Sequence, residues 1–244
     1  MSFRATTAVA ARVLHQLRRD PRTIALIVFV PCVLETLLKE LFADRPAVFQ
    51  HVGPPLLGLF PFVTMFLVTS ITMLRERTSG TLERLMTLPI AKLDLLAGYG
   101  IAFAVMAAVQ AAVISLLSFG LLGLDVQGPR ALVVALAIAN AVLGSALGLF
   151  LSAFAQTEFQ AVQFMPAVVL PQILLCGLFV DRGSMARWLR LLSDALPLTY
   201  AYDALARTAS NTLDGRFAVD VVVVCGCVAV SLALGAATLR RRTA

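Results

Sequence analysis

The chain has 244 residues, of which 59% are hydrophobic and 14% are charged, and its formal net charge is +6. Soluble domains carry about a quarter charged residues, because charged side chains cover their surface. The composition therefore excludes a soluble globular fold and predicts an all-α integral membrane protein with several spans. In such a protein an excess of Lys and Arg reports topology, so it is no sign of nucleic-acid binding.

Residues that could perform catalysis or bind a metal are sparse. The four cysteines lie in apolar runs without the spacing of zinc ligands, and His15 and His51 are the only histidines. The apolar segments hold no serine–histidine pair, metal-ligand cluster or group of carboxylates on one face. We therefore predict no catalytic residue and no metal site, which argues against a membrane-embedded enzyme.

Segment 1–22 is predicted to form a basic amphipathic helix. At 100° per residue, its arginines fall within an arc of about 120°, and apolar residues occupy the opposite arc. This pattern is typical of a helix that lies in the inner headgroup layer. Asp20, Pro21 and Arg22 should end it before the first span. The helix is either a topology anchor or an element that carries force between a partner and the spans.

Apolar stretches of about 20 residues, the length that crosses a bilayer, predict six transmembrane helices. The first carries Glu35, Lys39 and Glu40, but its twelve Leu, Ile, Val and Phe residues favour insertion by roughly 5 kcal/mol, more than the cost of about 3 kcal/mol for one central acid. Pro166 and Pro171 interrupt the fifth. The predicted spans are 24–42, 52–74, 95–122, 131–155, 159–180 and 221–239.

The positions of Lys and Arg predict which side of the membrane each loop faces. Twelve lie in the N-terminal segment, in 75–94 and in the C-terminal tail, which share one side of a six-span arrangement, and seven lie on the other side. Both termini should therefore be cytoplasmic. We see no signal-peptide cleavage site after the first span. Abundant Arg and Ala beside few Lys suggest a bacterial protein, so the expected location is the bacterial inner membrane.

Segment 75–92 reads as a span end, a sharp turn and a short helix. Gly80 can end the second span in a left-handed conformation, and Thr81 can cap the next helix with Glu83 in its first turn. Pro89 should stop that helix after about two turns, so we predict it at 81–89. Leu82, Leu85 and Met86 share its apolar side. The segment is either a charged loop or a docking element.

Segment 183–205 follows the fifth span and is predicted to form a re-entrant outer element. Residues 184–192 are amphipathic and include Trp188, the only tryptophan, which favours a membrane interface. Pro197 breaks the segment, and a lipid-exposed break is costly. The element therefore lies within protein or at headgroup level, as an outer gate or as a plain extracellular loop.

A family resemblance emerges from three of these segments taken in order. Residues 75–90, RERTSGTLERLMTLPI, resemble the E-x₃-G-T-x-E-x-L-x₃-P signature of type-2 ATP-binding-cassette exporter permeases, the class that includes daunorubicin-resistance and nodulation-factor export permeases. Residues 12–31 and 174–205 resemble the basic N-terminal segment and the outer hairpin of the same family. The likeness departs at Asp181-Arg182, where the family often has proline, and at Ala206, where it often has arginine.

The resemblance implies a single permease domain that spans residues 1–244 and works with other chains. The helix at 81–89 would be a coupling helix seated in a cytosolic ATPase subunit. Two such subunits would bind ATP and Mg, this chain would hold no cofactor, and a second permease, identical or homologous, would complete the path among membrane lipids. The implied ATPase-docking residues are Glu76, Gly80, Thr81, Leu82, Glu83, Arg84, Leu85 and Pro89.

Polar residues inside the spans are candidates for the substrate path. Glu35 and Lys39 have the i, i+4 spacing and order of a favourable ion pair, and an acid within a span is a candidate functional site. Gln163 and Gln172 make the fifth span polar, either for the path or for helix packing. In contrast, Asn140, Gly144, Gly148 and Ser152 recur every four residues, which predicts a packing stripe.

Two functions remain open at this stage. The first is the permease of an ATP-driven exporter that moves an amphipathic drug, a lipid or a lipid-linked substrate out of the cytoplasm or inner leaflet. The alternative is a self-contained secondary transporter or channel driven by an ion gradient. Such a transporter favours paired acids or inverted repeats in the spans, whereas this chain offers one deep carboxylate, Glu35. No phosphate-loop motif occurs in the sequence, so ATP chemistry would need another chain.

Overall fold

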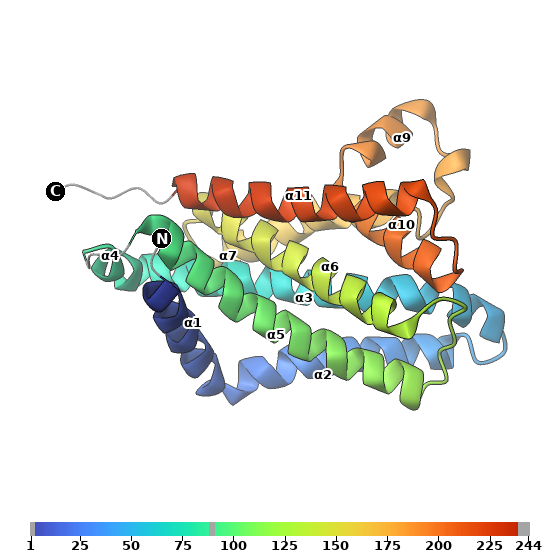
Figure 1. Ribbon diagram of the computed structural model, residues 1–244, viewed down its shortest axis with the longest axis horizontal. Helices are drawn as coiled ribbons and strands as arrows, with labels where there is room; N and C mark the ends of the chain where they lie inside the picture. Colours follow the sequence, from blue (N-terminus) through green and yellow to red (C-terminus); the bar gives the residue numbers. More distant parts are fainter. Residues whose placement is uncertain (1–2, 88–90, 239–244) are drawn as a thin grey trace.

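A computed structural model describes residues 3–87 and 91–238, and its ordered elements are helices joined by short turns (Figure 1). The α-helices are α1 (Phe3–Arg18), α2 (Pro21–Leu41), α3 (Pro46–Thr78), α4 (Thr81–Met86), α5 (Lys92–Gly120), α6 (Arg130–Leu151), α7 (Glu158–Phe164), α8 (Leu170–Leu175), α9 (Arg187–Asp194), α10 (Pro197–Ala209) and α11 (Gly215–Thr238). The 3-10 turns η1 (Ser152–Phe154) and η3 (Arg182–Ser184) and the π-helical segment η2 (Met165–Val169) lie between them.

The long helices form an elongated bundle whose two ends differ. Helices α2, α3, α5, α6 and α11 run along its long axis, and α1 lies across one end (Figure 1). Helix α4 lies at that same end, where α11 also finishes, whereas α9 lies toward the opposite end. Because α1 and the last turn of α11 share an end, the chain passes along the bundle an even number of times.

Five of the described helical segments are long and apolar enough to cross a bilayer, which confirms an all-α membrane protein. They are Pro46–Thr78, Leu93–Gly120, Arg130–Phe154, Glu158–Leu175 and Gly215–Thr238. Helix α2, the predicted first span, is not among them. Its 21 residues give a length of about 31 Å, close to the roughly 30 Å of a hydrocarbon core. The six-span count therefore stays a prediction.

Helix boundaries differ from the predicted spans at several ends. The second predicted span, 52–74, lies within the longer α3, and the third, 95–122, runs past the end of α5 at Gly120. The fifth, 159–180, is helical only to Leu175, because Gly177 has a φ of +108° that a regular helix cannot accommodate. Leu239, the end of the sixth, lies outside the described residues, as do the basic residues of the tail.

The packing of α3 against α6 confirms the predicted stripe of small residues. A Cβ on Gly148 would lie 2.5 Å from the carbonyl oxygen of Phe66, and a Cβ on Gly144 would collide with the carbonyl oxygen of Phe62. The two backbones therefore approach more closely than any side chain allows, as small-residue interfaces in membranes do. Asn140, one turn earlier, is buried beside Gly58 of α3.

The close approach at Gly144 can be tested by substitution. Gly144→Ala should lower stability by about 1–3 kcal/mol, the usual cost of overpacking a filled interior, measured as thermal unfolding of the full chain in detergent. Gly226→Ala in α11 is the matched control, since a Cβ there meets nothing within 4 Å. Equal effects of the two substitutions would contradict the proposed backbone contact.

Candidate functional site

The turn between α3 and α4 matches the prediction at Gly80. Gly80 has a φ of +72°, and a Cβ there would meet nothing within 4 Å, so its left-handed backbone rather than crowding explains the glycine. The amide of Arg84 donates to the carbonyl of Gly80 at 3.0 Å, so Gly80 takes the N-cap position that we predicted for Thr81. The Thr81 hydroxyl instead lies 2.9 Å from that of Ser79.

The predicted docking residues of α4 divide into buried and exposed groups. Leu82 is 3% exposed and belongs to an apolar cluster with residues of α1, α2, α3, α5 and α6, and Leu85 packs against the same cluster. Arg84 is exposed. The side chain of Glu83 and all of Pro89 lie outside the described part of the chain. The outward surface of the turn is therefore polar, and its leucines attach α4 to the bundle.

Glu76 joins three helices rather than facing outward. It is 3% exposed, and its Oε2 accepts a hydrogen bond from Arg12 Nη2 of α1 at 3.0 Å. The same Nη2 donates to the Tyr99 hydroxyl of α5 at 2.6 Å. Burial lowers the pKa of Arg12, but Tyr99 and Glu76 outweigh it, so the pKa is raised and the guanidinium stays charged. This triad ties α1 and α5 to the last turn of α3.

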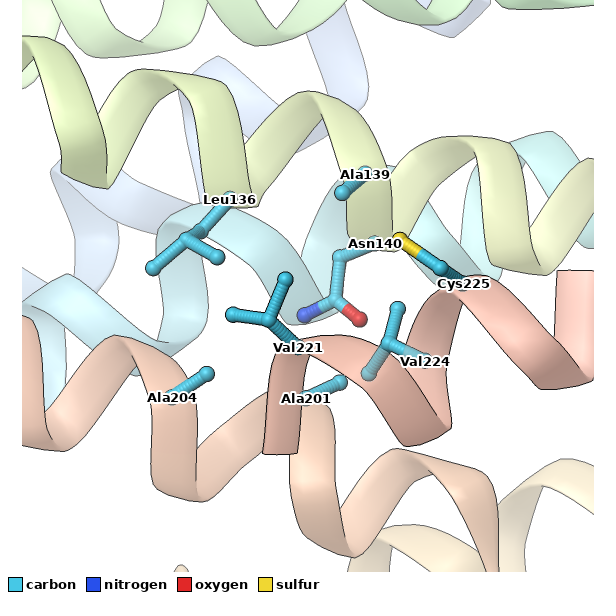
Figure 2. A pocket seen from close by; sticks show the side chains of 8 residues that line it. All are labelled: Leu136, Ala139, Asn140, Ala201, Ala204, Val221, Val224 and Cys225. Atoms are coloured by element: carbon cyan, nitrogen blue, oxygen red, sulfur yellow. The ribbon is translucent and has the colours of Figure 1, made fainter. Parts of the chain in front are cut away.

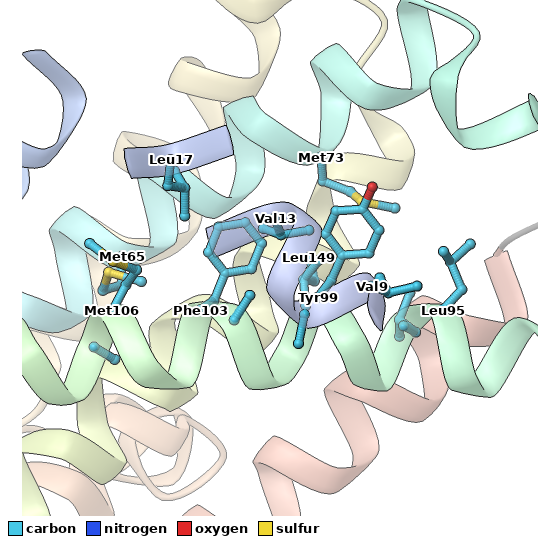
Figure 3. Packing of buried hydrophobic residues seen from close by; sticks show 14 of the residues in the cluster. Val9, Val13, Leu17, Met65, Met73, Leu95, Tyr99, Phe103, Met106 and Leu149 are labelled. Atoms are coloured by element: carbon cyan, nitrogen blue, oxygen red, sulfur yellow. The ribbon is translucent and has the colours of Figure 1, made fainter. Parts of the chain in front are cut away.

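Helix α1 packs its apolar face on α5 instead of turning it to lipid. Figure 3 shows Val9, Val13 and Leu17 of α1 beside Tyr99 and Phe103 of α5. This packing attaches α1 to the bundle by its apolar face, and the location of the helix in the inner headgroup layer stays a prediction.

The break after α1 falls where the sequence predicts it. Helix α1 ends at Arg18, and the carboxylate of Asp20 caps α2 by accepting from the amide of Thr23 at 3.2 Å. Hydrogen bonds from Thr23 hold the pKa of Asp20 below its ordinary value. Together with the triad, this joint favours the second interpretation of α1, an element that carries force to the spans.

Glu35 and Lys39 do not form the predicted ion pair. Glu35 is 0% exposed, and neither carboxylate oxygen has a hydrogen-bond partner among the described residues. A Cβ on Gly53 would lie 3.5 Å from Glu35 Oε1, so the carboxyl group sits against α3. Lys39, one turn later, remains partly exposed. The lysine stem can instead reach toward the helix end.

The two glutamines of the fifth span have different surroundings. Gln163 is exposed and lines a hollow of about 430 Å³ with Gln156, Gln160 and neighbouring apolar residues. Gln172 is buried, donates to the Val168 carbonyl at 3.1 Å and accepts from the Leu198 amide at 3.4 Å. The structure therefore places Gln163 on an open face and Gln172 at the joint between α8 and α10.

A cavity of about 20 Å³ between α6, α10 and α11 is too small for a substrate. Asn140 is the one polar side chain among the residues that line it, and its amide points toward Val221 and Val224 (Figure 2). A volume of this size holds a single water molecule. The hollow at Gln163 is thus the better candidate for contact with a transported molecule.

Sequence reasoning missed Gln110, which is 1% exposed in α5. Its Nε2 donates to the Ile27 carbonyl of α2 at 2.8 Å and to the Thr64 hydroxyl of α3 at 2.5 Å. Pro31 explains the first bond, because a proline has no N–H for the carbonyl four residues earlier. A search for polar residues opposite proline-freed carbonyls would have found it. Gln110 thus supplies the donor that α2 lacks.

Comparisons with known proteins show which protein family the chain resembles. A family model described as "ABC-2 type transporter" matches residues 4–208. The chain is 25% identical to ABC transporter G family member 20 of Dictyostelium discoideum over 156 residues. The aligned region covers 64% of this chain and 21% of that protein. It is 25% identical over 187 residues to the linearmycin resistance permease protein LnrN of Bacillus subtilis, covering 75% and 47%.

A third relative is the probable multidrug ABC transporter permease YbhR of Escherichia coli, 25% identical over 152 residues that cover 62% of this chain and 41% of that protein. The chain thus spans less than half the length of each of these curated relatives.

The bridge made by Gln110 predicts a specific coupling. Gln110→Leu should cost about 1 kcal/mol of stability, the scale of one buried hydrogen bond. In a Pro31→Ala background the loss should shrink, because the alanine N–H can pair with the Ile27 carbonyl within α2. Thermal unfolding of the full chain in detergent, as a double-mutant cycle, measures this. An equal loss in both backgrounds would show that Gln110 acts through Thr64 or packing alone.

Proposed function

The chain belongs to the ABC-2 type transporter family, and on that premise we propose that it is the permease subunit of an ATP-driven exporter. A separate ATPase would energise the export of an amphipathic drug, a lipid or a lipid-linked substrate from the cytoplasm or inner leaflet. The two relatives named as permeases for linearmycin resistance and multidrug transport support an export role.

The observation that carries the proposal is the rigid mounting of α4. Gly80 turns this short helix away from the end of α3, and its leucines pack into the apolar cluster that α1, α2, α3, α5 and α6 share. One turn earlier, Glu76 is bound to α1 and thereby to α5. A force applied to α4 would therefore act on α1, α3 and α5 together. Such a mounting suits a helix that transmits motion from a partner to the spans.

We propose two cytosolic ATPase subunits as the partners at this end, with ATP and Mg bound there. Arg84 and Glu83 would make the polar contacts, and Thr81, Pro89 and the exposed edge of the half-buried Leu85 would frame the surface. Glu76 and Leu82 would act from inside, by positioning α4. The two termini and α4 would then face the cytoplasm of a bacterial cell whose inner membrane holds the bundle, in agreement with the basic residues near this end.

We further propose that a second permease, identical or homologous, covers the face of α7, η2 and α8. This segment is mostly exposed, with only 17% of residues 158–175 buried, and it presents Gln163 and Pro166. A polar side chain and an irregular backbone are costly against lipid and tolerated against protein or a water-filled path. The substrate path would run there, with α2 and α3 at its border, among membrane lipids.

Reversing the charge of Arg84 tests the docking surface. Arg84→Glu should weaken binding of the co-purifying ATPase by roughly 10- to 100-fold, because a charge-assisted contact contributes about 1.5–3 kcal/mol. Arg45→Glu, an exposed arginine before α3 at the other end of the bundle, is the matched control. Binding is measured by titration of the ATPase onto the full permease in detergent. Unchanged binding by Arg84→Glu and loss by Arg45→Glu would place the docking surface at the other end.

A substitution at Glu35 distinguishes the exporter from the gradient-driven secondary transporter. The buried carboxyl group of Glu35 is the observation that favours the secondary transporter. Glu35→Gln should leave ATP-driven transport in vesicles within about twofold and raise thermal stability, since an unpartnered buried carboxyl group is costly. Glu35→Asp serves as the control that keeps the acid. Transport that continues without ATP under a proton gradient, and that Glu35→Gln abolishes, would support the secondary transporter and refute the proposed function.

A further inference from the structure

The outer element predicted at 183–205 contains two helices that attach to the bundle in different ways. Helix α10 packs between α3, α6 and α11, and its Leu198 and Leu205 are 0% exposed. Helix α9 has Ser193 as its one buried residue, and the Ser193 hydroxyl donates to the Leu175 carbonyl of α8 at 2.8 Å. Apolar packing therefore holds α10 in place, whereas α9 depends on a few polar contacts.

Arg182 connects the parts of this outer element from the turn η3. Its Nη1 donates to Asp203 Oδ2 of α10 at 2.7 Å, and its Nη2 donates to Asp194 at the end of α9. The side chains of Arg182 and Asp203 are 24% and 21% exposed, so this pair is shielded from most of the solvent. The sequence departs from the resembled family at Asp181-Arg182, so this contact does not follow from family membership.

Arg207 makes a second set of ion pairs, one turn after Asp203 on α10. Its Nη1 donates to both carboxylate oxygens of Asp214 at 3.2 Å, and its Nε lies 3.2 Å from Oδ2 of Asp220. Asp214 also accepts a hydrogen bond from the amide of Phe217 at 3.1 Å. Arg207 therefore ties α10 to the first turns of α11.

Asp203 lies between the two arginines and is attracted by both. Asp203 and Arg207 have the i, i+4 spacing, with the acid nearer the N-terminus, that lets two charges meet on one helix. Burial raises the pKa of Asp203, and the attraction of Arg182 and Arg207 offsets only part of this effect. The carboxylate is thus poorly solvated and costly to leave without a cation. If Arg182 is lost, Arg207 is the other arginine that acts on it.

We propose that Arg182 and Arg207 form one switch that shares Asp203. In the arrangement described here, Asp203 pairs with Arg182, and Arg207 holds Asp214 and Asp220. When Arg182 separates from α10, Asp203 draws Arg207 toward itself and away from Asp214, so the attachment of α10 to α11 weakens as well. Release of α9 at one end of the segment thereby favours release of α11 at the other.

The shared carboxylate distinguishes this switch from two independent ion-pair clusters. Groups without a common partner act additively, whereas groups that share a partner are coupled. The switch lies toward the end of the bundle opposite α4 (Figure 1). If the chain exports a substrate as proposed, the substrate leaves at this end, and the switch would let α9, α10 and α11 rearrange together. That role rests on the proposed function, whereas the exchange of ion-pair partners does not.

Amide hydrogen exchange of the full chain in phospholipid nanodiscs, measured by mass spectrometry, tests the coupling. Arg182→Gln should speed exchange in α9, which loses a direct contact, and also by roughly fivefold in residues 214–220, which Arg182 does not touch. Arg187→Gln is the matched control and should change neither, since Arg187 is an exposed arginine of α9 without an ion pair among the described residues. Unchanged exchange in residues 214–220 of Arg182→Gln would show two separate clusters and overturn the proposal.

A second substitution separates the exchange of partners from general loosening of the segment. Asp203→Asn added to Arg182→Gln removes the carboxylate that competes for Arg207. Exchange in residues 214–220 should then return to within about twofold of the wild type, while α9 stays fast. Exchange that remains fast in residues 214–220 of the double variant would show that Asp203 does not compete for Arg207, and the switch would be refuted.

Discussion

Lipid offers no hydrogen bonds, so every backbone group within the bilayer must find its partner in the protein. Pro31 and Pro166 break this rule locally, and the structure repairs both breaks. Pro31 frees the Ile27 carbonyl, which Gln110 of another helix binds. Around Pro166 the chain is π-helical. The Met165 amide donates to the Val162 carbonyl, and the Leu170 amide donates to the Met165 carbonyl. The repairs decide which helices must stay together.

Repair by a neighbouring helix and repair within the same helix have different mechanical results. The Gln110 bond couples α2 to α5 and, through Thr64, to α3. The π-helical repair is local and leaves the face of α7 and α8 uncovered. Three helices are thereby linked as one body at a proline that could otherwise act as a hinge. The fifth segment, in contrast, keeps an irregular and mostly exposed surface, which is the face that we propose a second permease covers.

The end of the bundle that carries α4 is organised by charge. Arg12, Glu76 and Tyr99 come from three helices and meet in a mostly buried triad, so the signature glutamate works inside the subunit. Arg75, its neighbour, makes a two-pronged ion pair with Glu158 at the start of α7. The residues around Gly80 thus connect a short projecting helix to α1, α5 and α7.

The sequence by itself determined the membrane class, the turn at Gly80, the break at Asp20 and Pro21, and the small-residue stripe, because composition, backbone restriction and residue spacing act locally. It also carried the family resemblance, which the match to residues 4–208 confirms. The tertiary structure decided the contacts between distant residues, which residue spacing does not specify. It turned Glu76 inward and buried Glu35 away from Lys39. It gave Gln110 its partners and set α9 and α10 on different sides of one segment. Each of these depends on which helix lies opposite, and packing between distant parts of the chain settles that choice.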